Sequence, residues 1–79
     1  MKIDEVENLD NFVLDNFGQR YYSIGVLQDN LIERWMFTND RYDIDRLTLG
    51  NFFFTVGEAI EYRNYLLAYY NTKKEIRNV

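Results

Sequence analysis

The side chains of this sequence that could act as nucleophiles are hydroxyls, and none has a histidine to activate it. The chain contains neither histidine nor cysteine, which removes the commonest general base, thiol chemistry and the usual metal-binding side chains. Candidate hydroxyls such as Ser23, Thr48 and Thr55 are accompanied by no glycine-rich phosphate loop. We therefore predict that the protein is not an enzyme, with no catalytic residue and no cofactor.

Carboxylates are the other candidates for chemistry. Asp40, Asp43 and Asp45 lie in the polar segment 39–46, and three aspartates in a loop invite a calcium interpretation. The glycine and the terminal glutamate of an EF-hand loop are missing, so we predict no metal site. Asp43 and Asp45 also lack an apolar pocket that would give them different acid and base roles.

The acidic residues near the N-terminus are better suited to binding than to catalysis. The chain has nine basic and thirteen acidic residues, a net charge of −4, and the whole excess lies in residues 1–18. Direct nucleic-acid binding would call for a basic stripe instead. The segment favours partners with a basic surface, or it only keeps the protein in solution. The acidic candidates for partner contact are Asp4, Glu5, Glu7, Asp10 and Asp15.

Aromatic residues form a second set of candidates. Tyr62, Tyr65 and Tyr69 share the side of a predicted helix that lies away from its apolar stripe, where tyrosine offers a large contact area at low entropy cost. Packing of N-terminal residues on these rings is the alternative. The three phenylalanines at 52–54 cannot all point the same way. We expect at least one in the core and one exposed or at an interface, with Phe52 as the candidate.

These candidates must be positioned by two predicted helices. Thr55 and Glu58 have the spacing of a capping box, which predicts a helix over residues 56–72. The residues that follow, 73–79, form a last helical turn or a tail. The expected core-facing residues of the helix are Val56, Ala59, Ile60, Leu66, Leu67 and Tyr70. The acidic segment 1–18 predicts a helix over residues 3–17, or a shorter one from Asn8, that ends at Gly18. It packs on the domain or docks on a partner.

Residues 20–38 have the pattern of a β-hairpin. Two β-rich runs, 21–27 and 31–37, flank Asp29-Asn30, a pair suited to a tight turn. Closing the turn there pairs Val26 with Glu33, Ile24 with Trp35 and Tyr22 with Phe37. The more apolar face, which we expect the C-terminal helix to cover, carries Tyr22, Ile24, Val26, Trp35 and Phe37.

Residues 47–49 predict a third strand with Leu47 and Leu49 facing inward, and Gly50-Asn51 then turns the chain. The predicted fold is one small α+β domain. It has an N-terminal helix, an antiparallel three-stranded sheet within residues 19–55 and a C-terminal helix packed on that sheet. We find no segment apolar enough to span a membrane and no leader, so we expect a cytoplasmic protein.

Residues 20–70 resemble a group of small proteins frequent in phages and prophages. The shared pattern is a hairpin ending near a tryptophan, a polar loop, and Arg-x-x-x-Gly-Asn-x-Phe-x-Thr-x-x-Glu-Ala. In this chain the pattern is carried by Trp35, Arg46, Gly50, Asn51, Phe53, Thr55, Glu58 and Ala59. Gly57 and Ile60 depart from it, and the acidic N-terminal segment lies outside it. The resemblance implies a phage or mobile-element origin in a bacterial host, and it identifies no catalytic residue.

Three functions follow as hypotheses. The first is a binding protein that inhibits or modulates a host protein, such as a CRISPR effector or another nucleic-acid-processing enzyme, by steric blocking. The second is a structural or self-association module, such as a homodimer that buries Phe52, Phe54 or the tyrosine face. The third, binding of single-stranded nucleic acid by stacking on Tyr21, Trp35 or Phe52, conflicts with the absence of a net basic charge.

Overall fold

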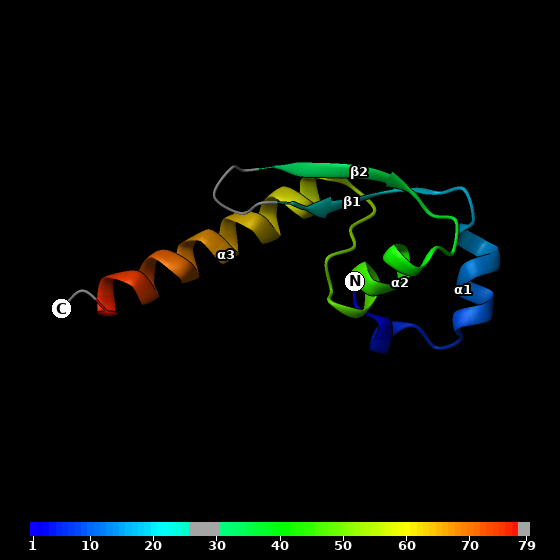
Figure 1. Ribbon diagram of the computed structural model, residues 1–79, viewed down its shortest axis with the longest axis horizontal. Helices are drawn as coiled ribbons and strands as arrows, with labels where there is room; N and C mark the ends of the chain where they lie inside the picture. Colours follow the sequence, from blue (N-terminus) through cyan, green and yellow to red (C-terminus); the bar gives the residue numbers. More distant parts are fainter. Residues whose placement is uncertain (26–30, 78–79) are drawn as a thin grey trace.

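The computed structural model of the chain describes residues 1–25 and 31–77. Along the chain, a short 3-10 helix, η1 (Ile3–Glu5), is followed by α1 (Leu9–Asn16), β1 (Arg20–Ile24), β2 (Ile32–Met36), α2 (Arg41–Thr48) and α3 (Val56–Arg77). The molecule measures 50 × 22 × 20 Å. It is elongated because the C-terminal half of α3 extends away from the other elements (Figure 1).

The third strand predicted at Leu47–Leu49 is wrong, because these residues belong to and follow the helix α2. Within the described residues the sheet has two strands, β1 and β2. Asp40 starts α2 through a reciprocal capping box, in which it and Asp43 each accept a hydrogen bond from the other's backbone N–H. Leu47 is buried as expected, whereas Leu49 is 77% exposed. The polar composition of segment 39–46 predicts a loop, but Asp40 and Asp43 have the spacing of a capping box and start a helix there.

The predicted hairpin exists, but its register differs. Trp35 lies opposite Tyr21, not Ile24, and Tyr22 lies opposite Arg34. This is a shift of three residues, and an odd shift moves every β1 side chain to the other face of the sheet. Tyr21 and Ser23 are therefore buried. The predicted turn at Asp29-Asn30 lies outside the described residues, as does Val26.

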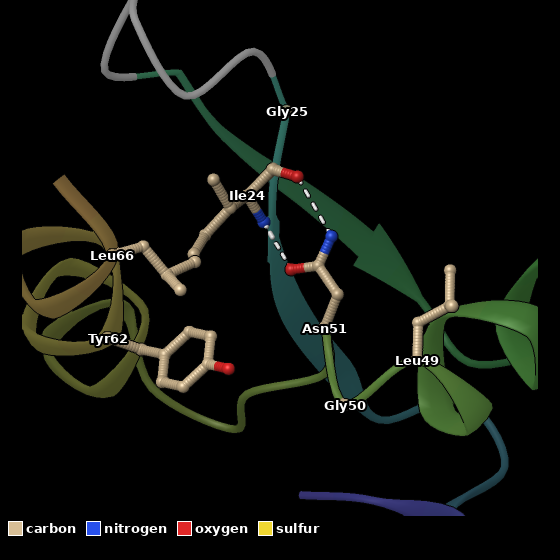
Figure 2. Close-up of a pocket in the computed structure, with 7 residues that line it drawn as sticks. All are labelled: Ile24, Gly25, Leu49, Gly50, Asn51, Tyr62 and Leu66. Atoms are coloured by element: carbon tan, nitrogen blue, oxygen red, sulfur yellow. Dashed lines mark hydrogen bonds between the residues drawn. The ribbon is translucent and has the colours of Figure 1, made fainter. Parts of the chain in front are cut away.

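The other face of β1 is covered by α3. Figure 2 shows the side chain of Ile24 pointing toward Tyr62 and Leu66 of α3. The expectation that α3 covers a face carrying both Ile24 and Trp35 is therefore only partly right. Trp35 packs against the buried cluster on the opposite side.

The free edge of β1 is paired by residues 51–53. Tyr22 and Phe53 exchange two backbone hydrogen bonds, of 2.7 and 2.9 Å, and form an isolated antiparallel bridge. Two residues along, the Asn51 side chain accepts from the Ile24 N–H at 2.7 Å and donates to the Ile24 carbonyl at 2.8 Å (Figure 2). An amide side chain thus replaces the next backbone pair. The left-handed Gly50, with φ of 75°, permits this turn.

The core is largely aromatic. Its buried members are Tyr21, Phe37, Leu47 and Phe52. The rings of Tyr21 and Phe52 stack with centroids 4.0 Å apart. Phe12 of α1 closes the cluster, with its ring edge-on to Phe37 at 5.6 Å. Such pairs add to the burial of apolar area. The core lies between the hairpin, α1, α2 and the segment 52–54.

The N-terminal segment packs on this core. The shorter predicted helix is confirmed, because α1 is capped by Asn8, whose side chain accepts from the Asn11 N–H at 3.1 Å. Gly18 follows it with a φ of 82°. Ile3, Val6, Phe12 and Val13 turn toward the buried cluster.

The helix α3 begins as predicted, with Thr55 accepting from the Glu58 N–H at 3.1 Å. Of its predicted inward residues, Ala59 is buried and Leu66 and Leu67 are half-buried, but three others are exposed: Val56, Ile60 and Tyr70. The helix continues to Arg77, so residues 73–77 are helical and not a tail. A helix this long has more surface than the two-stranded sheet can cover.

Candidate functional site

A buried polar cluster joins β1 to α2 around Asp43. The Asp43 carboxylate accepts from the Tyr21 hydroxyl, from the backbone N–H of Thr38 at 3.0 Å and from that of Asp40 at 3.1 Å. Arg46 forms a salt bridge with the same carboxylate at 3.3 Å and donates to the Tyr21 oxygen at 2.7 Å. Asp43 is only 3% exposed, so each of these bonds replaces one lost to water.

The protonation states in this cluster follow from the same contacts. Burial, together with the hydrogen bond to Asp43, raises the pKa of Tyr21 well above its usual range. Burial alone acts to raise the pKa of Asp43. The hydrogen bonds from Tyr21, Thr38 and Asp40 and the charge of Arg46 outweigh burial and hold that pKa below its usual value. Asp43 is therefore ionised and Tyr21 is neutral at neutral pH.

Arg46 is also held by an aromatic ring. Its guanidinium carbon lies 3.7 Å from the centroid of the Trp35 ring, a cation–π contact. The Trp35 Nε1–H in turn donates to the Ser23 oxygen at 2.9 Å. Tyr21 and its hydroxyl are fully buried, so no substrate can approach them. The cluster is a connection between strand and helix.

A groove of about 430 Å³ lies on the outer side of α3, where a ligand can approach. Its helix residues are Glu58, Glu61, Tyr62 and Tyr65. Their spacing of three, one and three residues places them on one face of a helix. The groove is completed by Phe53, from the segment that bridges to β1, and by Met1.

The aromatic floor of this groove is a row of rings. The Phe53 and Tyr62 centroids lie 5.5 Å apart, and those of Tyr62 and Tyr65 lie 6.1 Å apart with planes inclined by 29°. Tyr65 is 65% exposed and Tyr62 39%. Tyr62 and Tyr65 thus each present a ring to solvent, in a groove that carboxylates of the same helix also line.

The position of Tyr62 is fixed from its other side. A second hollow, of about 290 Å³, is lined by residues of β1, of the turn after α2 and of α3, among them Ile24, Leu49, Tyr62 and Leu66. Figure 2 shows Tyr62 and Leu66 side by side on α3, facing Ile24. Tyr62 therefore contacts the sheet on one side and lines the outer groove on the other.

A third hollow, also of about 290 Å³, adjoins the α3 groove through Met1, which lines both. Its other residues come from the N-terminal segment: Glu5, Val6, Glu7, Asn8, Asn11, Phe12 and Asp15. The two adjoining grooves share a chemical character. Carboxylates line each of them, and no lysine or arginine within the described part of the chain lines either.

The predicted contact residues separate into three groups. Glu5, Glu7 and Asp15 line the N-terminal groove, and Tyr62 and Tyr65 line the α3 groove. Asp4, Asp10 and Tyr69 are exposed outside both grooves. The third group is Phe52 alone. Its prediction as a contact residue is wrong, because it is fully buried against Tyr21 and unavailable to a partner.

Neither of the neighbours of Phe52 is exposed, so the first alternative, an exposed phenylalanine within 52–54, is wrong. The second alternative, a phenylalanine at an interface, stays a prediction. Phe53 is buried and Phe54 is half-buried. The alternating backbone of a bridging segment sends successive rings to opposite sides. One side is the core and the other is covered by Tyr62 of α3.

Sequence reasoning missed Phe53, Glu58 and Glu61 as site residues. The signal for the two glutamates was present, because Glu58, Glu61, Tyr62 and Tyr65 have helical spacing. Glu58 had been assigned only to the helix cap. Phe53 could not be foreseen, because its place beside Tyr62 depends on the bridge to β1.

Comparison of the chain with protein-family models, with curated proteins and with solved structures finds no match. No helix among the described residues is long and apolar enough to span a membrane. The site is therefore interpreted from its own geometry.

Proposed function

We propose that the protein is a non-catalytic binding protein that attaches to a basic surface of a bacterial host protein and blocks it. Such a surface occurs where an enzyme holds nucleic acid, as in a CRISPR effector or another nucleic-acid-processing enzyme. The observation that carries the proposal is the pair of adjoining grooves, one from the N-terminal segment and one from α3. Both are lined by carboxylates and, among the residues that the structure describes, by no lysine or arginine.

The shape of the N-terminal segment supports this proposal. Four of its apolar residues, Ile3, Val6, Phe12 and Val13, pack against the core, while Asp4, Glu5, Glu7, Asp10 and Asp15 are exposed. The acidic surface is therefore held in place before binding, which lowers the entropy cost of association. Charge complementarity then raises the rate of encounter and excludes acidic partners.

We expect the protein to block its partner by occupying space, and not by imitating the charge of nucleic acid. A net charge of −4 is small beside a nucleic-acid strand, which carries one charge per phosphate. The aromatic rings beside the carboxylates add contacts that the phosphate backbone lacks.

Affinity capture from a bacterial host lysate tests the proposal. The wild-type chain and a variant carrying Glu5→Gln, Glu7→Gln and Asp15→Asn serve as baits at low and physiological salt. We expect the wild type to retain a nucleic-acid-processing enzyme that the variant loses, and addition of the wild type to reduce nucleic-acid binding by that enzyme. Asp45→Asn removes an exposed carboxylate of α2 outside both grooves and serves as the matched control.

Two results would contradict the proposal. One is equal capture by the wild type and the triple variant, since the acidic surface would then play no part. The other is a captured enzyme whose nucleic-acid binding does not change when the protein is present.

Self-association is the second candidate function, favoured by the part of α3 that extends beyond the sheet (Figure 1). Tyr65 and Tyr69 lie four residues apart on one face of α3, and both are exposed. Pairing of α3 with α3 of a second copy would cover these side chains. Sedimentation equilibrium decides: a concentration-dependent dimer that Tyr69→Ser weakens supports this function, and a monomer at all concentrations excludes it.

A further inference from the structure

We propose that the α3 groove formed by Phe53, Glu58, Glu61, Tyr62 and Tyr65 binds an arginine side chain of the partner protein. The inference rests on the proposed function, because it names the group by which the partner's basic surface is held. It assigns to the groove a defined ligand, a guanidinium, and not merely positive charge.

The arrangement of the groove fits a planar cation. Glu58 and Glu61 lie one turn apart on the face of α3 that also carries Tyr62 and Tyr65. The tyrosine rings are inclined by only 29° and their centroids are 6.1 Å apart. A flat group that lies against one exposed ring therefore comes within reach of a carboxylate from the same helix.

The chemistry of guanidinium meets both requirements. It is planar and always charged, it stacks on aromatic faces, and its fork of N–H donors matches a carboxylate. An ammonium group is a compact, strongly hydrated point charge and makes poor use of a row of rings. The groove is therefore expected to distinguish arginine from lysine.

The interior of this protein already contains the same combination. Arg46 lies with its guanidinium carbon 3.7 Å from the centroid of the Trp35 ring and pairs with Asp43 at 3.3 Å. In the α3 groove the rings and carboxylates are present, and no lysine or arginine of the described residues lines it. The N-terminal ammonium of Met1, which also lines the groove, is bound to the Phe52 carbonyl at 2.9 Å. The stem of Lys2, the basic residue nearest to Met1 in sequence, lies against Gly50 instead.

Binding of a short capped peptide with a single arginine among glycines tests the inference on the full chain. Its matched probe carries citrulline, which keeps the shape of the side chain and removes the charge. Amide shifts in ¹H–¹⁵N NMR spectra give both the location and the affinity. We expect the arginine peptide to shift the amides of Glu58, Glu61 and Tyr65, and the citrulline peptide to bind about tenfold more weakly.

Matched variants distinguish binding in the α3 groove from general attraction of the peptide to a negatively charged protein. Glu58→Gln with Glu61→Gln is expected to weaken the arginine peptide about tenfold, whereas Asp45→Asn leaves it unchanged. Tyr65→Leu is expected to weaken it about fivefold. Tyr42→Leu provides the aromatic control, because Tyr42 and Tyr65 are both 65% exposed and Tyr42 lies outside the groove.

The outcomes distinguish this inference from the proposed function. Equal binding of arginine and citrulline peptides, no binding of either, or shifts confined to the surroundings of Glu5 and Glu7 overturns the arginine site. Arginine-specific shifts at α3 that Glu58→Gln with Glu61→Gln abolishes support it. If those shifts are seen while no enzyme is captured or inhibited, the arginine site stands and the proposed blocking function fails.

Discussion

Two regions of the molecule combine aromatic rings with carboxylates, and they differ in whether a guanidinium of the chain pairs with them. In the interior, Arg46 lies between the Trp35 ring and the Asp43 carboxylate. On the outer side of α3, Tyr62 and Tyr65 lie beside two glutamates in a groove that no basic residue of the described chain lines.

The difference separates stability from recognition. Asp43 is almost completely removed from water, so its charge would be costly without Arg46 and the three other donors. The groove carboxylates belong to exposed residues of α3, where water solvates them at little cost. The Asp43 cluster is complete without any other molecule. At the α3 groove the N-terminal ammonium of Met1 donates to the Phe52 carbonyl, and a guanidinium is gained only by binding one.

Asp43→Asn should have the largest effect. The amide removes the negative charge beside Arg46 and replaces one acceptor oxygen by a donor, which no longer suits the N–H groups of Thr38 and Asp40. We expect the free energy of unfolding to fall by about 3 kcal/mol. Urea denaturation followed by circular dichroism measures it.

Asp45→Asn is the matched control for this change, because Asp45 is an exposed residue of the same helix. It should alter the free energy of unfolding by less than about 0.5 kcal/mol. Equal effects of the two substitutions would show that the interior cluster is no more important to stability than a surface charge.

Arg46→Lys should have an intermediate effect. Lysine keeps the charge near Asp43 but loses the planar stack on Trp35 and the fixed fork of donors. A loss of about 1 to 2 kcal/mol of unfolding free energy is expected. Trp35 is the single tryptophan of the chain, so a change in its fluorescence spectrum reports the loss of the contact directly. An unchanged spectrum and stability would argue against the stack.

The pH dependence of stability should also report Asp43. Its pKa is lower in the folded than in the unfolded chain, despite burial, because of its hydrogen bonds and Arg46. The folded state thus binds this proton less readily, so the contribution of Asp43 is fully present above pH of about 4 and is lost as the pH falls through the folded value.

The stability difference between the wild type and Asp43→Asn should therefore narrow as the pH is lowered. Urea denaturation at neutral pH and at a series of acidic pH values measures it for both proteins. A difference that stays constant down to the acid end of the series would mean that the carboxylate charge is not what holds the cluster.

Local signals in the sequence were sufficient for the starts of α1 and α3 and for two turns. Asn8 caps α1, Thr55 caps α3, and Gly18 and Gly50 adopt positive φ where the chain turns. Each of these depends on one residue and its nearest neighbours. The Asp40–Asp43 box that starts α2 is a signal of the same kind, and including Asp-x-x-Asp among capping boxes would have predicted the helix.

Long-range features could not be predicted in the same way. The strand β1 is covered on both faces, by the Asp43 cluster on one side and by α3 on the other, so alternation of apolar residues did not fix its register. The register is set instead by two hydrogen bonds, one from the Tyr21 hydroxyl to Asp43 and one from Trp35 Nε1 to Ser23. These partners lie 22 and 12 residues apart in the sequence.

The residues of the motif at 46–59 mainly make contacts within the fold. Arg46 stacks on Trp35, Asn51 pairs with the backbone of Ile24, and Phe53 bridges to Tyr22. Of its members, Phe53 and Glu58 alone also line the α3 groove. The tyrosines and Glu61 that complete the groove lie outside the motif, so the motif identifies no ligand.

Tyr65→Leu should have the smallest effect on stability. It tests whether the α3 groove, unlike the Asp43 cluster, contributes little to stability. A 65% exposed ring has little packing to lose, so the free energy of unfolding should change by less than about 0.5 kcal/mol, as it should for Tyr42→Leu. Thermal or urea denaturation of both variants measures this. If Tyr65→Leu destabilised the fold as strongly as Asp43→Asn, the α3 groove would belong to the structural framework, and its rings and carboxylates would need no ligand to account for them.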